Sequence, residues 1–329
     1  MKQKLLIWAM LPLMMLNACG EGDDETLEYG NWKELSDFEG VVRSGAVSFV
    51  MNGKAYVGTG FDGTDRLQDF WEYDHQKGYW TQKADFPGTA RNEAVGFSVG
   101  NQGYIGLGYD GEEERGDFWK YDPGSNTWSS VVGFGGSARH GAFSFTLNGI
   151  AYVGAGFDGN DLRDFWKYDH ENDHWIQVAS VGGSKRVNPF AFVVDGRGYV
   201  GGGRHNGLYE NDLWEYNPED NTWTEKNKLN DEDTGDASLA RENPVCFTLD
   251  GKVYVCTGYN GGYLADTWEY DPLLDTWTSM PDFEGVARST AVGFVLDNQA
   301  FLATGNNGTS YRFDDLWKFD PTAIYDEED

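Results

Sequence analysis

Basic residues and histidines are scarce in this sequence, and each shortage excludes a class of function. Lys and Arg number 25 against 54 Asp and Glu, which gives a formal net charge of −29. A surface that binds nucleic acid or docks on anionic lipid needs clustered Lys and Arg, so neither partner is expected. No cluster with metal-ligand spacing is formed by the five His, which are His75, His140, His170, His174 and His205. We therefore expect no metal and no cofactor.

Aromatic residues and glycine are abundant by contrast. The chain of 329 residues contains 13 Trp, 18 Tyr and 20 Phe, together with 44 Gly. Disordered segments are poor in aromatic residues, and a collagen-like chain needs Gly at every third position. The composition therefore indicates a folded protein that is rich in β-structure.

The first 18 residues have the pattern of a secretion signal. Lys2 and Lys4 precede an apolar run over 5–16, which is shorter than the roughly 20 residues that a membrane-spanning helix needs. The run ends in the letters LNACG, which look like a bacterial lipobox with Cys19 as the lipidated residue. A simple signal peptide with a chance Cys is the alternative. We expect a lipoprotein signal peptide over 1–18 and attachment to the membrane by lipid alone.

An acidic tether is expected over 19–28. Its letters EGDDE at 21–25 resemble the signal that exports lipoproteins of Bacteroidota to the cell surface, and a plain solvated tether is the alternative. We therefore expect an outer-membrane lipoprotein of a bacterium, facing either the periplasm or the cell surface.

The body of the chain repeats one unit six times. Each unit contains an Asp-x-Trp segment, and successive anchoring Trp residues lie 48, 47, 48, 54 and 49 positions apart. This period is typical of a four-stranded propeller blade. The six anchoring residues are Trp71, Trp119, Trp166, Trp214, Trp268 and Trp317.

Alternation and turn residues divide each unit into four antiparallel strands. In the first unit, Asn52-Gly53 joins two strands as a two-residue hairpin, because a type I′ turn needs positive φ at both positions. A second Trp marks the fourth strand of every unit except the last, and the missing copy is Trp32. The sequence thus predicts one all-β, six-bladed propeller over 29–322, with a strand at about 29–35 completing the blade built from 288–320. An acidic tail over 323–329 follows, and we expect a monomer.

The units resemble kelch repeats of the galactose oxidase/kelch superfamily. Each has an Arg before the first strand, a Gly pair after the second, and Tyr and Trp at fixed offsets. The usual adjacent Gly pair is split, as in Gly58-Thr59-Gly60, and Cys256 and Ala303 replace its first member in the last two units. Glycine at this place lets neighbouring segments approach closely.

An Arg follows the closing Trp of each unit at a fixed distance of eleven residues, except where an acidic insertion around 230–237 lengthens the loop. Because strands alternate direction, all six fall on one face, around the mouth of the central channel. There they are expected to bind a carboxylate of an anionic glycan or a protein partner. The alternative is that each Arg braces its own loops. The six are Arg43, Arg91, Arg139, Arg186, Arg241 and Arg288.

Departures from the repeat supply further candidates for binding, because blade-forming residues recur six times whereas residues serving one ligand need not. Seven such departures lie near the Arg positions: Glu93, His140, Asn188, Arg204, His205, Tyr209 and Glu242.

Two enzyme activities are implied by the kelch resemblance. Galactose oxidase uses a copper site of two His, two Tyr and a Cys–Tyr crosslink on seven blades, which this sequence does not match. The six-bladed, secreted sialic-acid mutarotases, such as N-acetylneuraminate epimerase, resemble it better. In that case Arg would hold the carboxylate, and Glu93 or Glu242 with His140 or His205 would act as acid and base. We expect a binding module first and a sugar mutarotase as the alternative.

Two more features receive structural interpretations. The turn at Asp250-Gly251 sets Cys246 opposite Val255, so that Cys256 points to the other sheet face and the two thiols form no disulfide. The acidic letters at 231–236 lack the spacing of a twelve-residue calcium loop and are expected to be a solvated loop.

Overall fold

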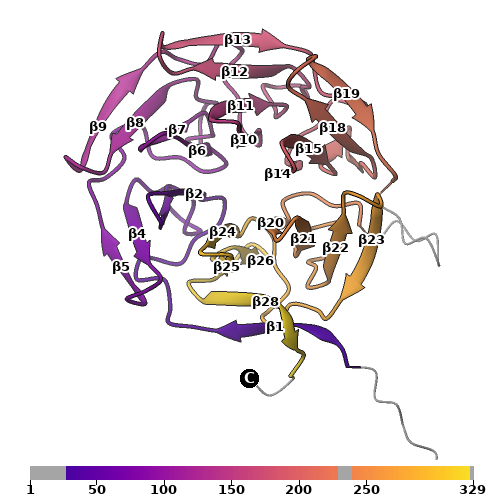
Figure 1. Ribbon diagram of the computed structural model, residues 1–329. Helices are drawn as coiled ribbons and strands as arrows, with labels where there is room; N and C mark the ends of the chain where they lie inside the picture. Colours follow the sequence, from indigo (N-terminus) through magenta and orange to yellow (C-terminus); the bar gives the residue numbers. More distant parts are fainter. Residues whose placement is uncertain (1–26, 229–238, 327–329) are drawn as a thin grey trace, which may run out of the picture.

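The computed structural model describes residues 27–228 and 239–326, which form six four-stranded antiparallel sheets arranged as a ring (Figure 1). The expected signal peptide, Cys19, most of the acidic tether, the insertion around 230–237 and the last three residues lie outside this part. Within the described part, no helix is long and apolar enough to cross a membrane. The six four-stranded sheets confirm the predicted six-bladed, all-β propeller.

Each of the first three blades consists of four consecutive strands. Blade 1 is β2 (Val47–Met51), β3 (Lys54–Gly58), β4 (Phe70–Asp74) and β5 (Tyr79–Gln82). Blade 2 is β6 (Val95–Val99), β7 (Gln102–Gly106), β8 (Phe118–Asp122) and β9 (Thr127–Val131). Blade 3 is β10 (Phe143–Leu147), β11 (Ile150–Gly154), β12 (Phe165–Asp169) and β13 (His174–Val178).

Blades 4 and 6 each carry an additional short hairpin. Blade 4 is β14 (Phe190–Val194), β15 (Arg197–Gly201), β18 (Leu213–Asn217) and β19 (Thr222–Glu225), with hairpin β16 (Arg204–His205) and β17 (Leu208–Tyr209). Blade 5 is β20 (Val245–Leu249), β21 (Lys252–Cys256), β22 (Thr267–Asp271) and β23 (Thr276–Met280). Blade 6 is β24 (Val292–Leu296), β25 (Gln299–Ala303), β28 (Leu316–Ile324) and β1 (Tyr29–Glu34), with hairpin β26 (Asn306–Asn307) and β27 (Tyr311–Arg312).

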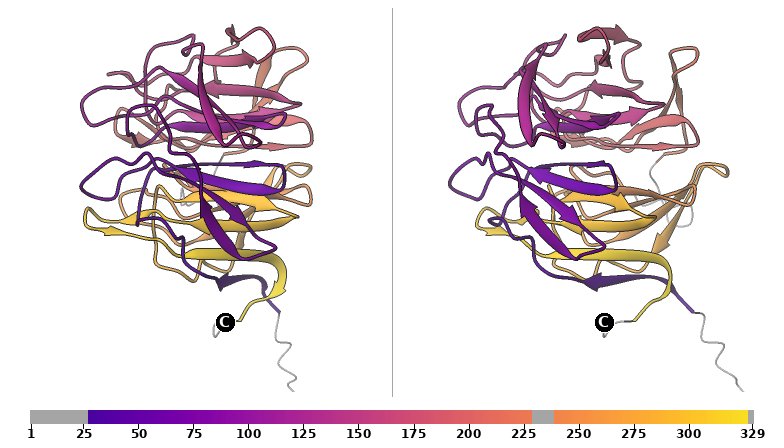
Figure 2. Two further views of the ribbon diagram at one scale, coloured as in Figure 1. Left: turned by 90° about the vertical axis from the view of Figure 1, so that its left-hand side faces the viewer. Right: turned by 60° about the vertical axis from the view of Figure 1, so that its left-hand side comes forward.

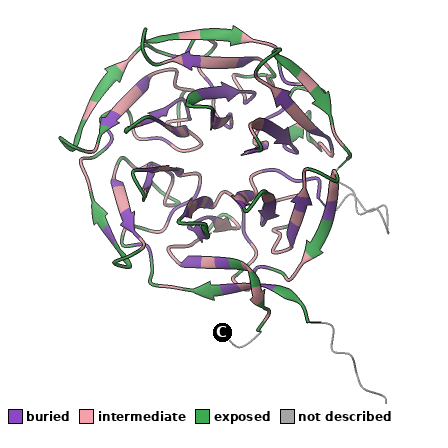
Figure 3. Ribbon diagram, in the orientation of Figure 1, coloured by how far each residue is buried: buried purple, intermediate pink, exposed green. Residues whose placement is uncertain are grey.

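The innermost strand of every blade alternates buried and half-buried residues, which is the signature of a strand whose two faces meet different neighbours. Seen from the side, the blades form a disc with loops projecting beyond the strands (Figure 2). Burial falls from the inner strands to the outermost strands, which carry most of the exposed residues (Figure 3). The apolar core therefore lies between neighbouring blades rather than at the rim.

The chain closes the ring by pairing its two ends. Strand β1 lies antiparallel to β28, with Trp32 opposite Phe319. The Trp32 side chain is fully buried, and its ring centroid lies 4.7 Å from that of Phe319 and 4.8 Å from that of Phe283 in blade 5. The predicted closing strand is thus confirmed. Strand β28 continues to Ile324, two residues beyond the predicted end of the propeller, because it pairs there with Tyr29.

The missing side chain of glycine makes room for a bulky neighbour at the end of the second strand. Gly58 pairs with Phe70, and a Cβ on this Gly would lie 2.7 Å from the Phe70 ring. In blade 5 the position holds Cys256, whose partner across the strands is the smaller Thr267. The departure from Gly therefore matches a reduction in the size of the opposing residue.

Cys246 and Cys256 are both free thiols, as predicted from the hairpin register. Cys246 lies opposite Val255, and Cys256 opposite Val245. Burial raises the pKa of Cys246 to about 12, so that this thiol stays protonated at neutral pH. The pair behaves as small buried side chains rather than as a redox couple.

Replacing Trp32 with Ala is expected to lower the free energy of unfolding by about 3–5 kcal/mol, because a fully buried aromatic side chain is lost from the seam between blades 5 and 6. Urea denaturation followed by circular dichroism measures the change. Tyr29→Ala is the matched control on the same strand, since that side chain is 50% exposed and its loss should cost less than about 1 kcal/mol. Equal effects of the two substitutions would show that β1 does not contribute to closure through its buried face.

Candidate functional site

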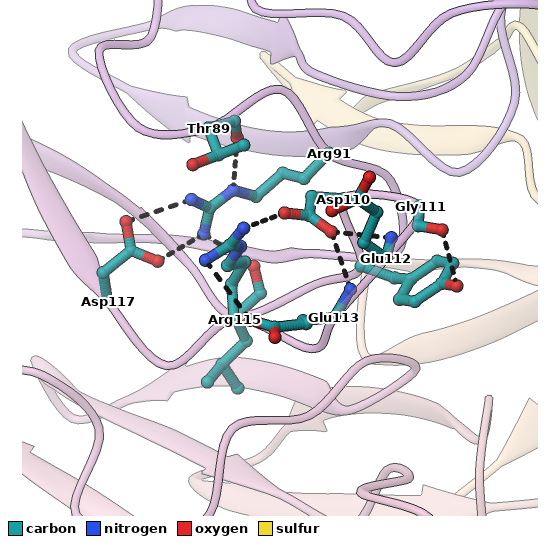
Figure 4. A network of polar contacts seen from close by, with 10 residues as sticks. Thr89, Arg91, Asp110, Gly111, Glu112, Glu113, Arg115 and Asp117 are labelled. Atoms are coloured by element: carbon teal, nitrogen blue, oxygen red, sulfur yellow. Dashed lines mark hydrogen bonds and ion pairs between the residues drawn. The ribbon is translucent and has the colours of Figure 1, made fainter.

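The six repeat arginines are buried and bound to their own blades. In blade 2, Arg91 donates from both Nη atoms to the two carboxylate oxygens of Asp117, at 2.6 and 3.0 Å (Figure 4). It also donates from Nη1 to the carbonyl of Leu107 at 2.9 Å and from Nε to the carbonyl of Thr89 at 2.8 Å. The guanidinium thereby ties together the loop before the first strand, the turn after the second and the start of the third.

The same arrangement recurs in all six blades. Each Arg is at most 1% exposed, and its partner is always the Asp of the Asp-x-Trp segment. One oxygen of this Asp also accepts a hydrogen bond from the indole Nε1 of the Trp two residues on, as between Asp69 and Trp71 at 2.7 Å. The other pairs are Arg43–Asp69, Arg139–Asp164, Arg186–Asp212, Arg241–Asp266 and Arg288–Asp315.

These contacts shift the protonation of the carboxylates. Burial raises the pKa of Asp69, but the hydrogen bonds and positive charge of Arg43 together outweigh burial and leave the pKa below its usual value. The same balance lowers the pKa of Asp117 and of Asp164. These three carboxylates are therefore held in their ionised form by their Arg partners.

This geometry favours the bracing role that the sequence left open for the repeat arginines. Their donors point at carbonyls and at Asp on the same blade, and their side chains are not exposed at the channel mouth. The partner is in every blade the Asp of the Asp-x-Trp segment, which recurs with the repeat. We therefore leave the six out of the candidate site.

A closed ring of backbone hydrogen bonds surrounds the central axis beside these braces. Its six residues stand two positions after each Arg, and all have φ between 51° and 60°. Each N–H donates to the carbonyl of the equivalent residue in the preceding blade. The bonds are Gly45 to Thr290 (3.0 Å), Glu93 to Gly45 (2.8 Å), Gly141 to Glu93 (3.2 Å), Asn188 to Gly141 (2.8 Å), Asn243 to Asn188 (3.1 Å) and Thr290 to Asn243 (3.3 Å).

The ring residues line a cavity of about 120 Å³ at the mouth of the channel. Because the backbone is the same in every blade, the six side chains are what distinguishes one sector from another. Glu93 is the one charged side chain among the six ring residues. Asn188, a second predicted candidate, lies in the same ring, and its Oδ1 is buried without a hydrogen-bond partner.

Glu93 and His140, two of the predicted acid and base candidates, are brought together. The Nε2 atom of His140 lies 3.8 Å from a carboxylate oxygen of Glu93, and its Nδ1 lies 3.5 Å from Glu114. Burial raises the pKa of Glu93, and the nearby Glu242 adds to the rise, while His140 and two arginines oppose it. A carboxyl group whose pKa is raised by burial is therefore present beside the cavity.

Glu242 stands on the other side of the mouth and is 7% exposed. It accepts a hydrogen bond from Nδ2 of Asn188 at 3.0 Å and lies 3.6 Å from Nε of Arg204. Tyr209 belongs to the same sector, with its ring centroid 6.3 Å from that of Tyr259. Burial raises the pKa of Tyr209, so its hydroxyl is a neutral donor.

His205 is separated from this acid and base cluster. Its Nδ1 lies 3.1 Å from Asp161, whose carboxylate also accepts from the backbone N–H of Asn206. The predicted pairing of Glu242 with His205 therefore has no counterpart among the contacts. Among residues 27–228 and 239–326, no group of three or more His, Cys, Asp or Glu is placed to hold a metal ion.

Two arginines at the mouth were missed from the sequence. Arg66 donates from Nε to Asn92 at 3.0 Å, and its guanidinium lies 5.1 and 5.0 Å from the ring centroids of Phe61 and Tyr109. Arg312 lies 4.7 Å from the same Phe61 ring. Both side chains are half-buried, and each contacts an aromatic ring of the blade that follows its own. They depart from the repeat as much as Arg204 does, so the same comparison between blades would have found them.

The Arg66 guanidinium has spare hydrogen-bonding capacity. Its terminal nitrogens make no hydrogen bond or ion pair within the described residues, whereas those of each repeat Arg are all directed at the protein. The Arg204 side chain is 44% exposed. Arg66, Arg204 and Arg312 therefore replace the six repeat arginines as the cations that a ligand can reach.

Comparison with known families agrees with this architecture. A model of the KLHDC2/KLHL20/DRC7 Kelch-repeats domain matches residues 133–305, and a Kelch motif model matches residues 43–87. The chain belongs to the kelch-repeat family. No protein with a curated description matches it by sequence.

Solved structures share the kelch propeller at low sequence identity. The structure of YjhT superposes with a TM-score of 0.73 at 16% identity, over 86% of this chain and 95% of that one. In total, 755 solved chains match, and a likeness this broad shows the fold alone. The residues at the mouth must therefore decide what this kelch propeller does.

Replacing Arg139 with Met is expected to destabilise the propeller by about 3 kcal/mol, because the mostly buried Asp164 loses its ion-pair partner. Arg163→Met is the control and should change the free energy of unfolding by less than about 0.5 kcal/mol, since that side chain is exposed and donates from Nη1 to the carbonyl of Gly183 at 3.2 Å. Thermal and urea unfolding of both variants test the difference. A stable Arg139→Met protein would mean that the repeat arginines do not brace the blades.

Proposed function

We propose that this kelch propeller is a binding module that takes the carboxylate of an anionic glycan at its channel mouth. The observation that carries the proposal is Arg66, whose guanidinium lies between two aromatic rings and keeps its terminal donors unused. Arg312 and Arg204 bring two further cations to the same mouth. Stacking on Phe61 and Tyr109 fixes the orientation of Arg66 before a ligand arrives, which reduces the entropy lost on binding.

The surroundings of these arginines suit a sugar acid better than a bare anion. The aromatic rings of Phe61 and Tyr109 pack against the cations, and Asn188, Asn243 and Thr290 offer hydrogen-bonding groups at the cavity. Small-molecule sites combine apolar walls with a few placed polar groups in this way. A guanidinium binds a carboxylate with two parallel hydrogen bonds, each worth about 1.5–3 kcal/mol once desolvated.

The proposed setting is the bacterial outer membrane, with the chain held by a lipid on Cys19 and acting outside the cytoplasm. This part of the proposal rests on the sequence of residues 1–28 alone. It fits a module that captures glycans at the periplasmic or outer side of the membrane. A protein partner at the same mouth is the competing occupant.

Glucuronate and N-acetylneuraminate are expected to bind the soluble domain more tightly than glucose does, because only the two acids engage Arg66 and Arg312. The double variant Arg66→Met, Arg312→Met should weaken binding of the acids by about 10- to 100-fold. Isothermal titration calorimetry measures both comparisons. Arg197→Met is the matched control, since Arg197 begins β15 at the hairpin turn away from the mouth and should leave affinity unchanged.

Equal affinities for glucuronate and glucose would contradict the proposal, and so would undiminished binding by the double variant. If none of the three sugars binds, a protein partner remains as the occupant of the mouth. Circular dichroism of each variant separates lost binding from lost folding.

A second candidate is the sugar mutarotase, and the closeness of Glu93 and His140 favours it. A carboxyl with a raised pKa at 3.8 Å from an imidazole is suited to exchange protons with a sugar hydroxyl. Proton NMR of freshly dissolved N-acetylneuraminate distinguishes the two functions. Catalysed anomer exchange that disappears in Glu93→Gln would assign the enzyme, whereas binding without exchange would assign the module.

A further inference from the structure

Glu93 occupies a position where the other five blades have no charge. The equivalent residues are Gly, Gly, Asn, Asn and Thr, and all six share the same positive φ and the same ring of backbone hydrogen bonds. Neither the blade fold nor the ring requires a carboxyl group there, because five blades form without one. A non-glycine residue at positive φ is also disfavoured, so Glu93 is costly as a purely structural residue.

The Glu93 side chain projects into the mouth cavity rather than into the core. It lines the cavity of about 120 Å³ and is 27% exposed, so a ligand entering the mouth meets its carboxyl group. Within residues 27–228 and 239–326, its carboxyl group accepts one hydrogen bond, from Nδ2 of Asn92 to Oε1 at 3.3 Å, and Oε2 has only the 3.8 Å approach of His140. The carboxyl is thus placed to exchange a hydrogen bond with a ligand.

The charged groups that face Glu93 come from several blades. They are Arg66 of blade 1, His140 of blade 3, Arg204 of blade 4 and Glu242 before blade 5. Glu114 of blade 2 faces the far nitrogen of His140. An anion bound by Arg66 would therefore lie within Coulomb range of an ionised Glu93 and be repelled by it.

We infer that Glu93 is the specificity-determining residue of the mouth: it takes up one proton from solvent when an anionic ligand binds, and its carboxyl O–H then donates a hydrogen bond to the ligand's carboxylate. The proton stays on Glu93, and no covalent bond of the ligand forms or breaks. The inference rests on the proposed function, because it needs an anion at Arg66. It explains why the Glu93 carboxyl group is present among side chains that bind a carboxylate.

The direction of the pH dependence follows from linkage. Burial already raises the pKa of Glu93, and a second negative charge beside it raises that pKa further, so the complex binds more protons than the free protein. Affinity for the anion therefore increases as pH falls, by at most about tenfold per pH unit for one proton. A neutral sugar adds no charge and should show no such dependence. The site therefore selects acids more strongly as the pH falls.

His140, which lies beside Glu93, is the alternative site for the proton. Two substitutions separate the contributions. Glu93→Gln keeps the size and hydrogen-bonding capacity of a protonated Glu but removes the titration, whereas His140→Gln removes the imidazole and leaves Glu93 in place. Both positions are solvent-accessible at the mouth, so neither substitution opens the core.

The test is calorimetric titration of the folded propeller with N-acetylneuraminate at pH 7.0, in phosphate and in Tris. The dependence of the binding enthalpy on the buffer's ionisation enthalpy counts the protons taken up. We expect net uptake of up to one proton for the wild type and for His140→Gln, and none for Glu93→Gln. As the pH is lowered from 8 to 6 the wild-type affinity should rise, whereas that of Glu93→Gln should stay level.

Uptake that persists in Glu93→Gln, or that disappears in His140→Gln, would overturn the inference and assign the proton to another group. Wild-type binding without any uptake would overturn it too, while leaving the anion-binding function intact. Absence of binding by the wild type in both buffers would reject the proposed function and the inference together.

Discussion

A buried guanidinium bound to a carboxylate holds each blade in shape, and the rest of the structure depends on that contact. In blade 2, Arg91 reaches Asp117, the carbonyl of Leu107 and the carbonyl of Thr89, so three separate loops converge on one side chain. Leaving either partner unpaired would strand a charge away from water. The planar fork of Arg fits the two carboxylate oxygens, and Lys would not replace it.

The brace also sets the geometry of the channel mouth. The carbonyl of each Arg accepts from a Gly of the preceding blade, as between Gly60 and Arg91 at 2.8 Å, and the residue two positions on enters the ring around the axis. Neighbouring blades are therefore joined by main-chain hydrogen bonds, which do not depend on the identity of the side chains. The side chains at the mouth are consequently able to vary without the loss of these bonds, and function belongs to those that break the sixfold pattern.

Sequence periodicity was sufficient for the fold, because strands, turns and closure are each encoded locally and then repeated. Trp32 identified the closing strand since it is the copy missing from the last unit, and Asp250-Gly251 fixed the register of the two thiols. The end of the propeller was placed two residues early because the pairing of Tyr29 with Ile324 joins the two ends of the chain and leaves no repeat to compare.

The candidate site was harder to predict, because a repeat locates a residue without giving the direction of its side chain. The Arg residues were expected to face the channel mouth, yet their partner lies 25–27 residues further on, in the segment used to count the blades. Arg66 and Arg312 were overlooked because they lie at the far ends of the loops after the second strands. Both side chains contact an aromatic ring of the next blade, and the sequence alone does not predict these contacts.

The central claim is that the six buried repeat arginines build the propeller, whereas Arg66, Arg204 and Arg312 at the channel mouth bind the ligand. A crystal structure of the complex with N-acetylneuraminate tests it most directly. The account expects the ligand's carboxylate within hydrogen-bonding distance of Arg66 or Arg312, Glu93 in contact with the ligand, and all six Arg–Asp pairs unchanged. A carboxylate held by any of the six repeat arginines, or a ligand bound away from the channel mouth, would contradict it.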